Sequence, residues 1–384
     1  MALYFLVTAL TLGLAGRIES RSRLLREGMG GLPPTRRRAF NAVLLTAVFG
    51  ILAGLAALRL EVGNDYGKYV ESFHEIWAGT DQAYVVTEAG FNGIVRLLYS
   101  LSGYENYLLV FALFGAATTF LFLKAMYEES ESFAGSFAMF MLLGLYFRTF
   151  TTVRYYLALA AALYCLRFLR RRQYGCFVLG ICLAALFHRS VLAVLPLYLL
   201  AHAERPVWLK KGLLRVSAAA GIGALLLRGP LLELALVWYP TYRDTVYLTQ
   251  DVGLLANLPG VIRCLLVFAL ALLAGRESRE RGENPFYLRL NFFGLLFYTC
   301  GSFLPLVSRL AYFAVTPQIL LVPGLLAGIG DKKRRRILTA AVGLVCFGYF
   351  LWFLHAASGG GIRVLPYRTW IFTDKEWING ADFF

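Results

Sequence analysis

Arginines near the ends of apolar segments are the residues of this sequence with the clearest potential for chemistry. They lie where the loops carry few other basic residues: Arg59, Arg96, Arg148, Arg154, Arg189, Arg228, Arg263 and Arg309. A guanidinium group presents a planar fork of N–H donors that matches two phosphate oxygens. An arginine that faces lipid near the bilayer centre costs about 2.5–3.5 kcal/mol, so it turns towards an anion or extends to the headgroups. We predict that Arg59, Arg148, Arg154 and Arg309 bind a diphosphate, with headgroup contacts as the alternative.

Three side chains near these arginines can accept a proton. Asp65 and Glu88 are the carboxylates of the loop that follows Arg59, and His188 lies near the end of an apolar segment. Each could take the proton of a sugar hydroxyl as the oxygen attacks an anomeric carbon. The structural alternatives are a turn cap for Asp65, a solvated carboxylate for Glu88 and a hydrogen-bonded membrane histidine for His188. We favour Asp65 together with Arg59, and the sequence leaves the choice of base open.

Tyrosines accompany these groups in the same segments. Tyr66, Tyr69, Tyr242 and Tyr367 all lie in segments that we expect on the outer side of a membrane. Sugar rings stack on aromatic faces, so these four are the candidates for glycan binding. The alternative is an aromatic belt, which places tyrosine and tryptophan at the membrane interface whatever the function.

Motifs for a soluble nucleotide donor are absent. The sequence contains no Walker loop, no dinucleotide fingerprint and no Asp-x-Asp pair, so a donor carried on lipid is the better match. HExxH is absent as well, and no set of residues has the spacing of metal ligands. We therefore predict no cofactor and no metal site, although a divalent cation would suit a diphosphate.

The composition identifies the elements that must position these residues. Of the 384 residues, 59% are hydrophobic, and the mean hydropathy is +0.62. A soluble domain of this size could not cover such a surface with polar groups. Apolar runs of about 17–25 residues can each cross the roughly 30 Å of hydrocarbon as a helix. We predict an all-α polytopic membrane protein that forms a single domain over residues 1–384.

The positive charge follows the same pattern. The formal net charge of +15 gathers in alternate loops, which we expect on the cytoplasmic side: 17–38, 124, 167–172, 205–215, 276–289 and 332–336. This distribution follows the positive-inside rule, so the basic pI does not indicate a nucleic-acid partner. Both termini are then expected outside.

About twelve membrane-spanning helices fit this alternation. We expect them at 2–16, 40–58, 107–127, 133–147, 153–168, two within 177–201, 213–227, 261–274, 290–306, 311–329 and 337–354. The stretch 177–201 is interrupted by His188-Arg189-Ser190 and Pro196, which favours a broken or re-entrant pair. The outer segments are the loops 59–106 and 228–259 and the tail 357–384. Apolar residues at helical spacing over Phe91 to Leu101 indicate a helix that lies in the interface.

The chain carries a set of short motifs in a fixed order. They are Arg59 with Gly63-Asn64-Asp65-Tyr66-Gly67-Lys68-Tyr69, then Glu88-Ala89-Gly90-Phe91, Arg154-Tyr155, Phe187-His188-Arg189-Ser190, Arg309-Leu310-Ala311-Tyr312-Phe313 and Pro366-Tyr367-Arg368. In this order they resemble the motifs of the EpsG-type, Wzy-like polymerases of bacterial exopolysaccharides. Ala89 replaces a proline of the family pattern and Tyr155 replaces a glutamine, so these two side chains are not expected to be catalytic.

The resemblance implies the membrane glycosyltransferase architecture called GT-C, in the bacterial cytoplasmic membrane with the active site on its outer face. It implies a polymerase that joins oligosaccharide repeat units carried on undecaprenyl diphosphate, with such molecules as both donor and acceptor. Undecaprenyl diphosphate is then the leaving group. Membrane lipid, a flippase and a chain-length regulator are the other implied partners.

Two other functions stay open on the sequence. An oligosaccharide ligase would use a similar arginine site and differ only in its acceptor. A transporter or flippase of lipid-linked sugars would also fit twelve helices. Such a protein would place its ionisable residues near the middle of the membrane, whereas here they collect at the outer ends of the helices.

Overall fold

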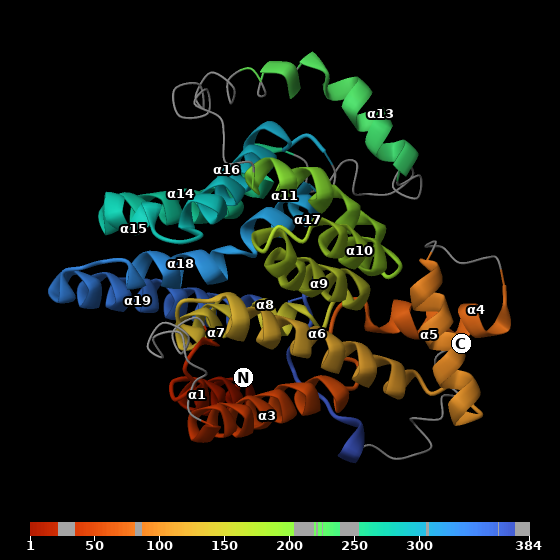
Figure 1. Cartoon of the computed structure of the whole chain (residues 1–384). Helices are drawn as coiled ribbons and strands as arrows, with labels where there is room; N and C mark the ends of the chain where they lie inside the picture. Colours follow the sequence, from red (N-terminus) through yellow and green to blue (C-terminus); the bar gives the residue numbers. More distant parts are fainter. Residues whose placement is uncertain are drawn as a thin grey trace.

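The computed structural model describes residues 1–21, 35–80, 87–202, 219, 222–224, 226–238, 253–304, 307–359 and 361–372 (Figure 1). Within these residues the regular structure is helical, apart from one isolated antiparallel bridge between Arg59 and Thr369. The predicted all-helical class is therefore confirmed for the described part of the chain.

The helices follow one another closely along the sequence. They are α1 (Ala2–Ala15), α3 (Thr35–Ala57), α4 (Tyr66–Ala78), α5 (Ala89–Ser102), α6 (Tyr107–Glu129), α7 (Phe133–Leu142), α8 (Leu145–Arg148), α9 (Val153–Arg170), α10 (Tyr174–Ala185), η1 (Arg189–Ala193), α11 (Val194–His202), α13 (Arg228–Trp238), α14 (Leu254–Ala274), α15 (Arg276–Glu280), α16 (Asn284–Cys300), α17 (Val307–Val315), α18 (Gln318–Ala327), α19 (Lys332–Ala356) and η4 (Trp370–Phe372).

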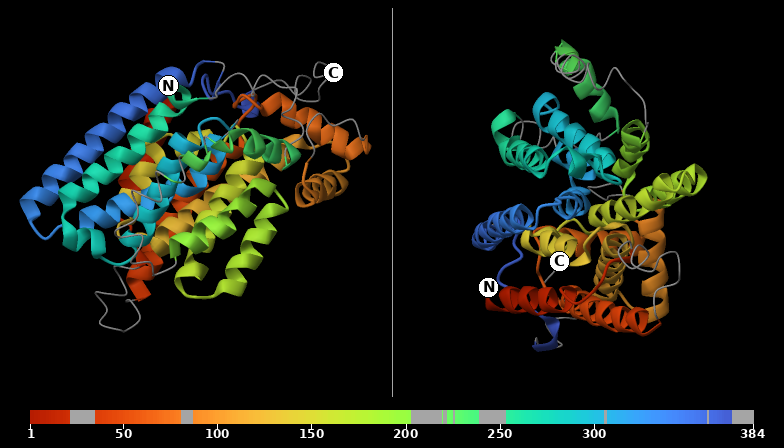
Figure 2. Two further views of the ribbon diagram at one scale, coloured as in Figure 1. Left: turned by 90° about the horizontal axis from the view of Figure 1, so that it is seen from above. Right: turned by 60° about the vertical axis from the view of Figure 1, so that its left-hand side comes forward.

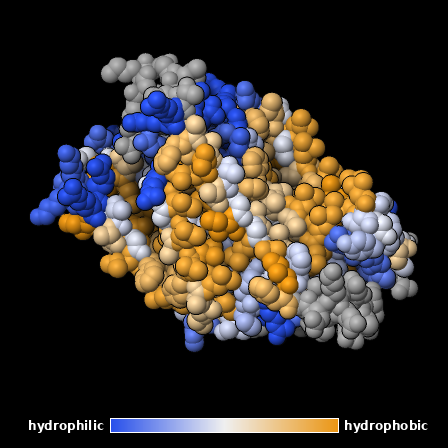
Figure 3. All heavy atoms as spheres, turned by 90° about the horizontal axis from the view of Figure 1, so that it is seen from below, coloured by the Kyte–Doolittle hydropathy of each residue, from blue (hydrophilic) through white to orange (hydrophobic). Residues whose placement is uncertain are grey.

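Five stretches of the described residues are long and apolar enough to cross a membrane: Arg36–Ala57, Tyr107–Glu129, Leu254–Ala274, Val307–Ala327 and Lys332–Ala356. A helix of 20 residues spans about 30 Å, the thickness of the hydrocarbon core. The hydrophobic face in Figure 3, bordered by hydrophilic residues, agrees with such an environment. The chain is thus a polytopic membrane protein, and four shorter apolar helices accompany these stretches.

Some expected spans are divided into shorter helices. The expected helix 133–147 ends at Leu142, because Gly144 adopts a left-handed conformation (φ +67°) before α8. The expected helix 311–329 breaks at Thr316-Pro317, between α17 and α18. The expected helix 213–227 lies largely outside the described residues.

The predicted interruption of 177–201 is confirmed at His188-Arg189-Ser190, where α10 ends and η1 begins. Pro196 was expected to contribute to this break, and that expectation is wrong. It lies in the first turn of α11, where a proline is tolerated because its missing N–H would have no partner within the helix.

The loop 59–106 contains two helices, α4 and α5, which lie together at one end of the bundle (Figure 2). Helix α5 confirms the helix predicted over Phe91 to Leu101, whereas α4 was not predicted. The two helices bury Tyr66, Tyr69, Phe73 and Phe91 in a core of their own with residues of α6. The segment between them, residues 81–86, lies outside the described residues.

The C-terminal segment 361–372 returns to the end of α3. Leu60 N donates to Arg368 O (3.0 Å), and Trp370 N donates to Leu58 O (3.3 Å). The Trp370 side chain donates to the carbonyl of Ala57 (3.1 Å). This segment, which we call the tail strap, therefore covers the residues that follow α3.

The opposite end of the bundle is held by ion pairs. Glu128 lies 2.5 Å from Arg167 and 3.6 Å from Arg21, and Arg170 pairs with Glu129 and Glu283. These pairs join α6, α9 and α16 at the side of the basic loops. We call this side the basic end, and the side that carries α4, α5 and the tail strap the mouth end.

Candidate active site

Arg154, in the first turn of α9, forms an ion pair with Glu88 at the mouth end. Its Nη1 donates to Glu88 Oε2 (2.5 Å), and Arg189 N donates to Glu88 Oε1 (3.1 Å). The guanidinium group lies 5.1 Å from the ring centre of Phe91. Glu88 is therefore not a solvated carboxylate, because both of its oxygens are occupied. It fixes Arg154 and joins the N-terminus of α5 to α9 and η1.

His188 lies beside this pair and is only 7% exposed. Its Nδ1 is 2.7 Å from Ser190 Oγ and accepts from Ser190 N at 3.4 Å. Burial lowers the pKa of His188 to about 3, and the nearby Arg154 and Arg309 lower it as well. The ring is therefore neutral at pH 7. Because Nδ1 accepts from a backbone N–H, the proton resides on Nε2.

Arg148 and Arg309 adjoin the same region. Both act electrostatically on the hydroxyl of Tyr156, and Arg309 also acts on His188. Arg148 Nη2 donates to Tyr349 Oη (3.3 Å), and its guanidinium lies 5.3 Å from the ring centre of Phe353. The structure thus brings Arg148, Arg154 and Arg309 into one neighbourhood, which we call the mouth cluster.

Asp65 is held next to this cluster. It precedes α4, is partly exposed, and its Oδ2 accepts from Thr152 Oγ1 at 3.2 Å. The side chain does not cap α4, contrary to the structural alternative for this residue. Tyr69 links Asp65 to the mouth cluster. Its hydroxyl accepts a hydrogen bond from Arg154 N (3.4 Å), and the Asp65 carboxylate acts on it electrostatically. Among the described residues no ion pair occupies the Asp65 carboxylate.

A backbone contact sets the position of residues 58–65 between α3 and α4, which we call the Asp65 loop. Gly63 has a φ of +109°, and a Cβ built on it would lie 2.3 Å from the carbonyl oxygen of Phe150. Only glycine fits this close approach. The turn between α8 and α9 that contains Phe150 also carries Arg148 and Arg154 at its two sides, so the loop and the arginines share one support.

Arg59, the fourth predicted diphosphate ligand, packs against the turn between α8 and α9 that carries Arg148 and Arg154. Its side chain is buried beneath the tail strap, 1% exposed, and its guanidinium lies 5.0 Å from the ring centre of Phe111 and 4.8 Å from that of Phe150. None of its three guanidinium nitrogens has a hydrogen-bond partner in the described part of the chain. Burial lowers the pKa of Arg59. The choice of Asp65 as the base together with Arg59 stays a prediction, as does diphosphate binding by Arg59. Such binding requires the strap to move, because the guanidinium group is buried.

The predicted glycan-binding tyrosines occupy internal positions. Tyr66 is 2% exposed and stacks on Phe111 at 4.3 Å, and Tyr69 is buried against Phe73 and Phe91. Tyr367 is partly buried and donates to Leu55 O at 2.8 Å. Tyr242 lies outside the described residues. In this conformation Tyr66 and Tyr69 offer no open ring face, so sugar stacking on these rings stays a prediction.

The structure adds residues that the sequence reasoning had not selected. Ser190 and Thr152 hold His188 and Asp65, and the backbone of Arg189 holds Glu88. Ser190 was visible in the motif Phe187-His188-Arg189-Ser190, because a hydroxyl two residues after a histidine can reach its ring. Thr152 gave no signal, since its contact with Asp65 joins residues 87 positions apart.

A second polar group lies among the helices next to the mouth cluster. Arg263 Nε donates to Gln318 Oε1 (2.5 Å), and Gln318 Nε2 donates to Asn291 Oδ1 (2.5 Å). Gln318 and Asn291 are buried. Hydrogen bonding of this kind satisfies polar side chains that would otherwise be costly inside a membrane protein.

The donor set of the mouth cluster is suited to an anion. Among the described residues, no three His, Cys, Asp or Glu side chains gather as metal ligands would. The cluster offers guanidinium groups, and its neighbours Asp65 and His188 add a carboxylate without an ion pair among the described residues and a neutral imidazole. Together these groups could bind a phosphorylated substrate and accept a proton.

Comparison with protein families agrees with this geometry. The sequence model of the EpsG family matches residues 42–369, which is most of the chain. The chain belongs to the EpsG family. EpsG is a family of Wzy-like polysaccharide polymerases, so the resemblance seen in the motifs is confirmed. No curated protein and no solved structure matches the chain. The EpsG match contains the whole mouth cluster, Asp65 and most of the tail strap, and it leaves out α1.

Proposed function

We propose that this EpsG-family protein is a membrane glycosyltransferase that polymerises oligosaccharide repeat units carried on undecaprenyl diphosphate. The observation that supports this most directly is the mouth cluster with its neighbours. Arg154 and Arg309 both act electrostatically on the neutral His188, and Tyr69 lies between Arg154 and the Asp65 carboxylate. Membership of a polymerase family supplies the reaction class. The cluster supplies the charge that such a leaving group requires.

The proposed reaction transfers a glycan from one lipid carrier to another. A hydroxyl oxygen of the acceptor repeat unit attacks the anomeric carbon of the donor glycan. The bond from that carbon to the diphosphate oxygen breaks, and undecaprenyl diphosphate leaves with the electron pair. Negative charge therefore grows on the diphosphate, where positioned arginines are most effective.

Asp65 is our choice for the proton acceptor. Its carboxylate receives one hydrogen bond, from Thr152, and is partly exposed, so it is able to approach a substrate hydroxyl. Glu88 is less suited to this role, because Arg154 and Arg189 already occupy both of its oxygens. We assign Glu88 the positioning of Arg154.

His188 and the arginines complete the proposed site. The neutral His188 carries a proton on Nε2 and can donate a hydrogen bond to a phosphate oxygen without changing its charge. Arg154, Arg309 and Arg148 would bind the diphosphate. Guanidinium groups can supply the positive charge that a diphosphate requires, and a divalent cation could add to it.

The cellular setting belongs to the same proposal. We infer a GT-C-like architecture of about twelve spans in the bacterial cytoplasmic membrane, with the mouth end on the outer face. The basic end supports this orientation, because Arg167, Arg170 and Arg281 gather there with the basic start of α19.

Incubation of the purified protein with one lipid-linked repeat unit tests the function. We expect a ladder of products that differ by one repeat on a gel, with Asp65→Asn at least 100-fold slower. Glu71→Gln is the matched control, because Glu71 is an exposed carboxylate on α4. A single transfer to another acceptor would indicate a ligase, and movement of substrate across a bilayer without new glycosidic bonds would indicate a transporter. Reactions with and without a chelator report any requirement for a divalent cation.

A further inference from the structure

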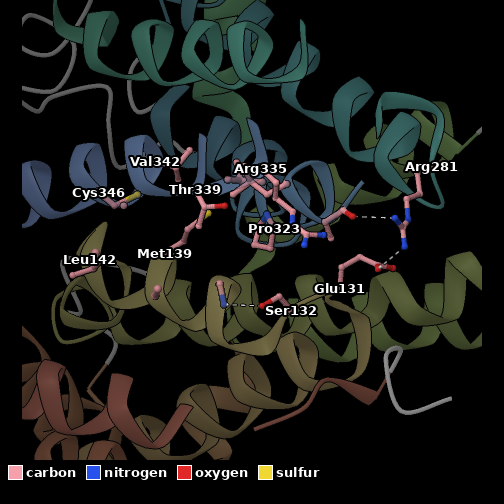
Figure 4. A pocket seen from close by; sticks show the side chains of 16 residues that line it. Glu131, Ser132, Met139, Leu142, Arg281, Pro323, Arg335, Thr339, Val342 and Cys346 are labelled. Atoms are coloured by element: carbon pink, nitrogen blue, oxygen red, sulfur yellow. Dashed lines mark hydrogen bonds and ion pairs between the residues drawn. The ribbon is translucent and has the colours of Figure 1, made fainter. Parts of the chain in front are cut away.

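A groove of about 680 Å³ begins at the basic end, and Figure 4 shows the side chains that line it. It runs between α7, α18 and α19, and most of its lining is apolar, including Met139, Leu142, Pro323, Gly343 and Cys346. Glu131, Arg281, Arg335, Ser132 and Thr339 form its polar part. The groove therefore has the two chemical parts of a lipid site, an apolar trough and a charged end.

The charged end carries more cations than anions. Arg281 Nη1 donates to Ala327 O (3.0 Å), and its Nη2 lies 3.9 Å from Glu131. Arg335 is exposed, and no ion pair of its side chain occurs within the described residues. It belongs to the basic run Lys332 to Arg336 at the start of α19. An anionic headgroup is the ligand that complements two arginines and one carboxylate.

The length of the groove matches one leaflet. From Arg335 to Cys346 the helix rises about 16 Å, at about 1.5 Å per residue. Half of the hydrocarbon core is about 15 Å thick. The groove thus begins at the level of the basic loops and ends near the middle of the membrane, which is the depth that an acyl chain of the adjacent leaflet occupies.

We propose that this groove binds an anionic phospholipid of the leaflet that faces the basic loops. One acyl chain lies between α7, α18 and α19, and the phosphate contacts Arg335 and Arg281. No residue of the mouth cluster lines the groove, so the proposal does not depend on the proposed polymerase function.

Glycines of α19 provide a matched pair of variants. Gly343 lines the groove, and a Cβ built on it meets no atom within 4 Å. Gly343→Leu therefore adds a side chain at the groove where the first carbon atom has open space. Gly348 lies on the same helix outside the groove and also has open space, so Gly348→Leu is the control. Arg335→Gln removes the headgroup contact, with Arg334→Gln as its exposed neighbour.

The test is titration of the delipidated full chain in detergent with fluorescent phosphatidylglycerol or phosphatidylcholine, followed by anisotropy. We expect phosphatidylglycerol to bind at least five-fold more tightly, and Gly343→Leu but not Gly348→Leu to lose this binding. Arg335→Gln should weaken it about five-fold, against less than about two-fold for Arg334→Gln.

Three results would each overturn the proposal. These are equal affinity for the two lipids, equal binding by the two leucine variants, and displacement of the label by undecaprenyl phosphate at lower concentrations than by phosphatidylglycerol. If Gly343→Leu does not fold, the arginine variants test the proposal. Equal affinities of Arg335→Gln and Arg334→Gln for phosphatidylglycerol would reject it.

Discussion

The ion pair of Arg154 and Glu88 allows the roles of these two side chains to be separated. Arg154→Gln should lower the polymerisation rate about 100-fold or more, because a positioned donor is lost where charge develops. Glu88→Gln should lower the rate less, because Arg154 keeps its positive charge and loses only its ion pair with Glu88. Rates measured with lipid-linked repeat units check this order. Lys68→Gln, an exposed cation on α4, is the control, and an Arg154→Gln enzyme that is as active as this control would contradict the assignment.

His188 should make the stability of the protein depend on pH. Its pKa is about 3 in the folded chain and about 6.5 when unfolded, so the unfolded chain binds the extra proton first. The stabilising contribution is thus present above about pH 6.5 and is lost as the pH falls towards 3. We expect the Tm of the wild type to fall more between pH 7 and pH 4.5 than that of His188→Gln. An equal fall in Tm for the two proteins would show that the folded structure does not hold His188 in its neutral form.

The guanidinium group of Arg59 is buried near two aromatic rings and has no hydrogen-bond partner among the described residues. A buried charge without a partner carries a desolvation cost that an apolar side chain of similar length does not. We therefore expect Arg59→Met to keep or raise the Tm in detergent. If the guanidinium binds a diphosphate after the strap moves, the same variant should lose activity at least ten-fold at unchanged stability. A large fall in Tm would instead assign Arg59 a structural role.

At the scale of elements, the contact of the Asp65 loop with the turn before α9 depends on Gly63. Gly63→Ala should destabilise the protein by about 1–3 kcal/mol, because the residue has a positive φ and no room for a Cβ. Gly67→Ala is the matched control, since Gly67 lies in α4 with open space around it. Denaturation in detergent gives the unfolding midpoint of each variant. Similar midpoints would show that the backbone around Gly63 can make room for a Cβ without loss of stability.

The same elements show what the sequence could and could not reveal. The spans α3, α6 and α19 follow from hydrophobic length, and the break at His188 follows from polar residues inside an apolar run. Helix α4 also had a signal, since Tyr66, Tyr69, Phe73 and Ile76 recur at helical spacing, but the charged residues between them suggested a loop.

The position of Arg59 could not be predicted, because it depends on pairing between segments about 300 residues apart in the chain. Leu60 N donates a hydrogen bond to Arg368 O, and the Tyr4 hydroxyl of α1 donates one to Val364 O. Local periodicity carries no information on such contacts. The gathering of Arg148, Arg154 and Arg309 was predicted from their types and from the side of the membrane on which they were expected.

At the scale of the whole molecule, the distribution of charge predicts its orientation. In a background without cysteines, Ser358→Cys at the mouth end should react with an impermeant maleimide in intact cells. Arg334→Cys at the basic end should react only after the cells are permeabilised. Labelling of both positions in intact cells, or the reverse pattern, would contradict the orientation on which the proposed outer active site depends.

The close approach of Gly63 to Phe150 has a consequence for how such proteins diversify. The close approach fixes the main chain of the Asp65 loop against the main chain of the turn that carries the arginines. Segments that recognise different sugars can therefore vary around this fixed unit without disturbing it. A single chemical apparatus could in this way serve many polysaccharides, with selectivity residing in residues that never touch the phosphates.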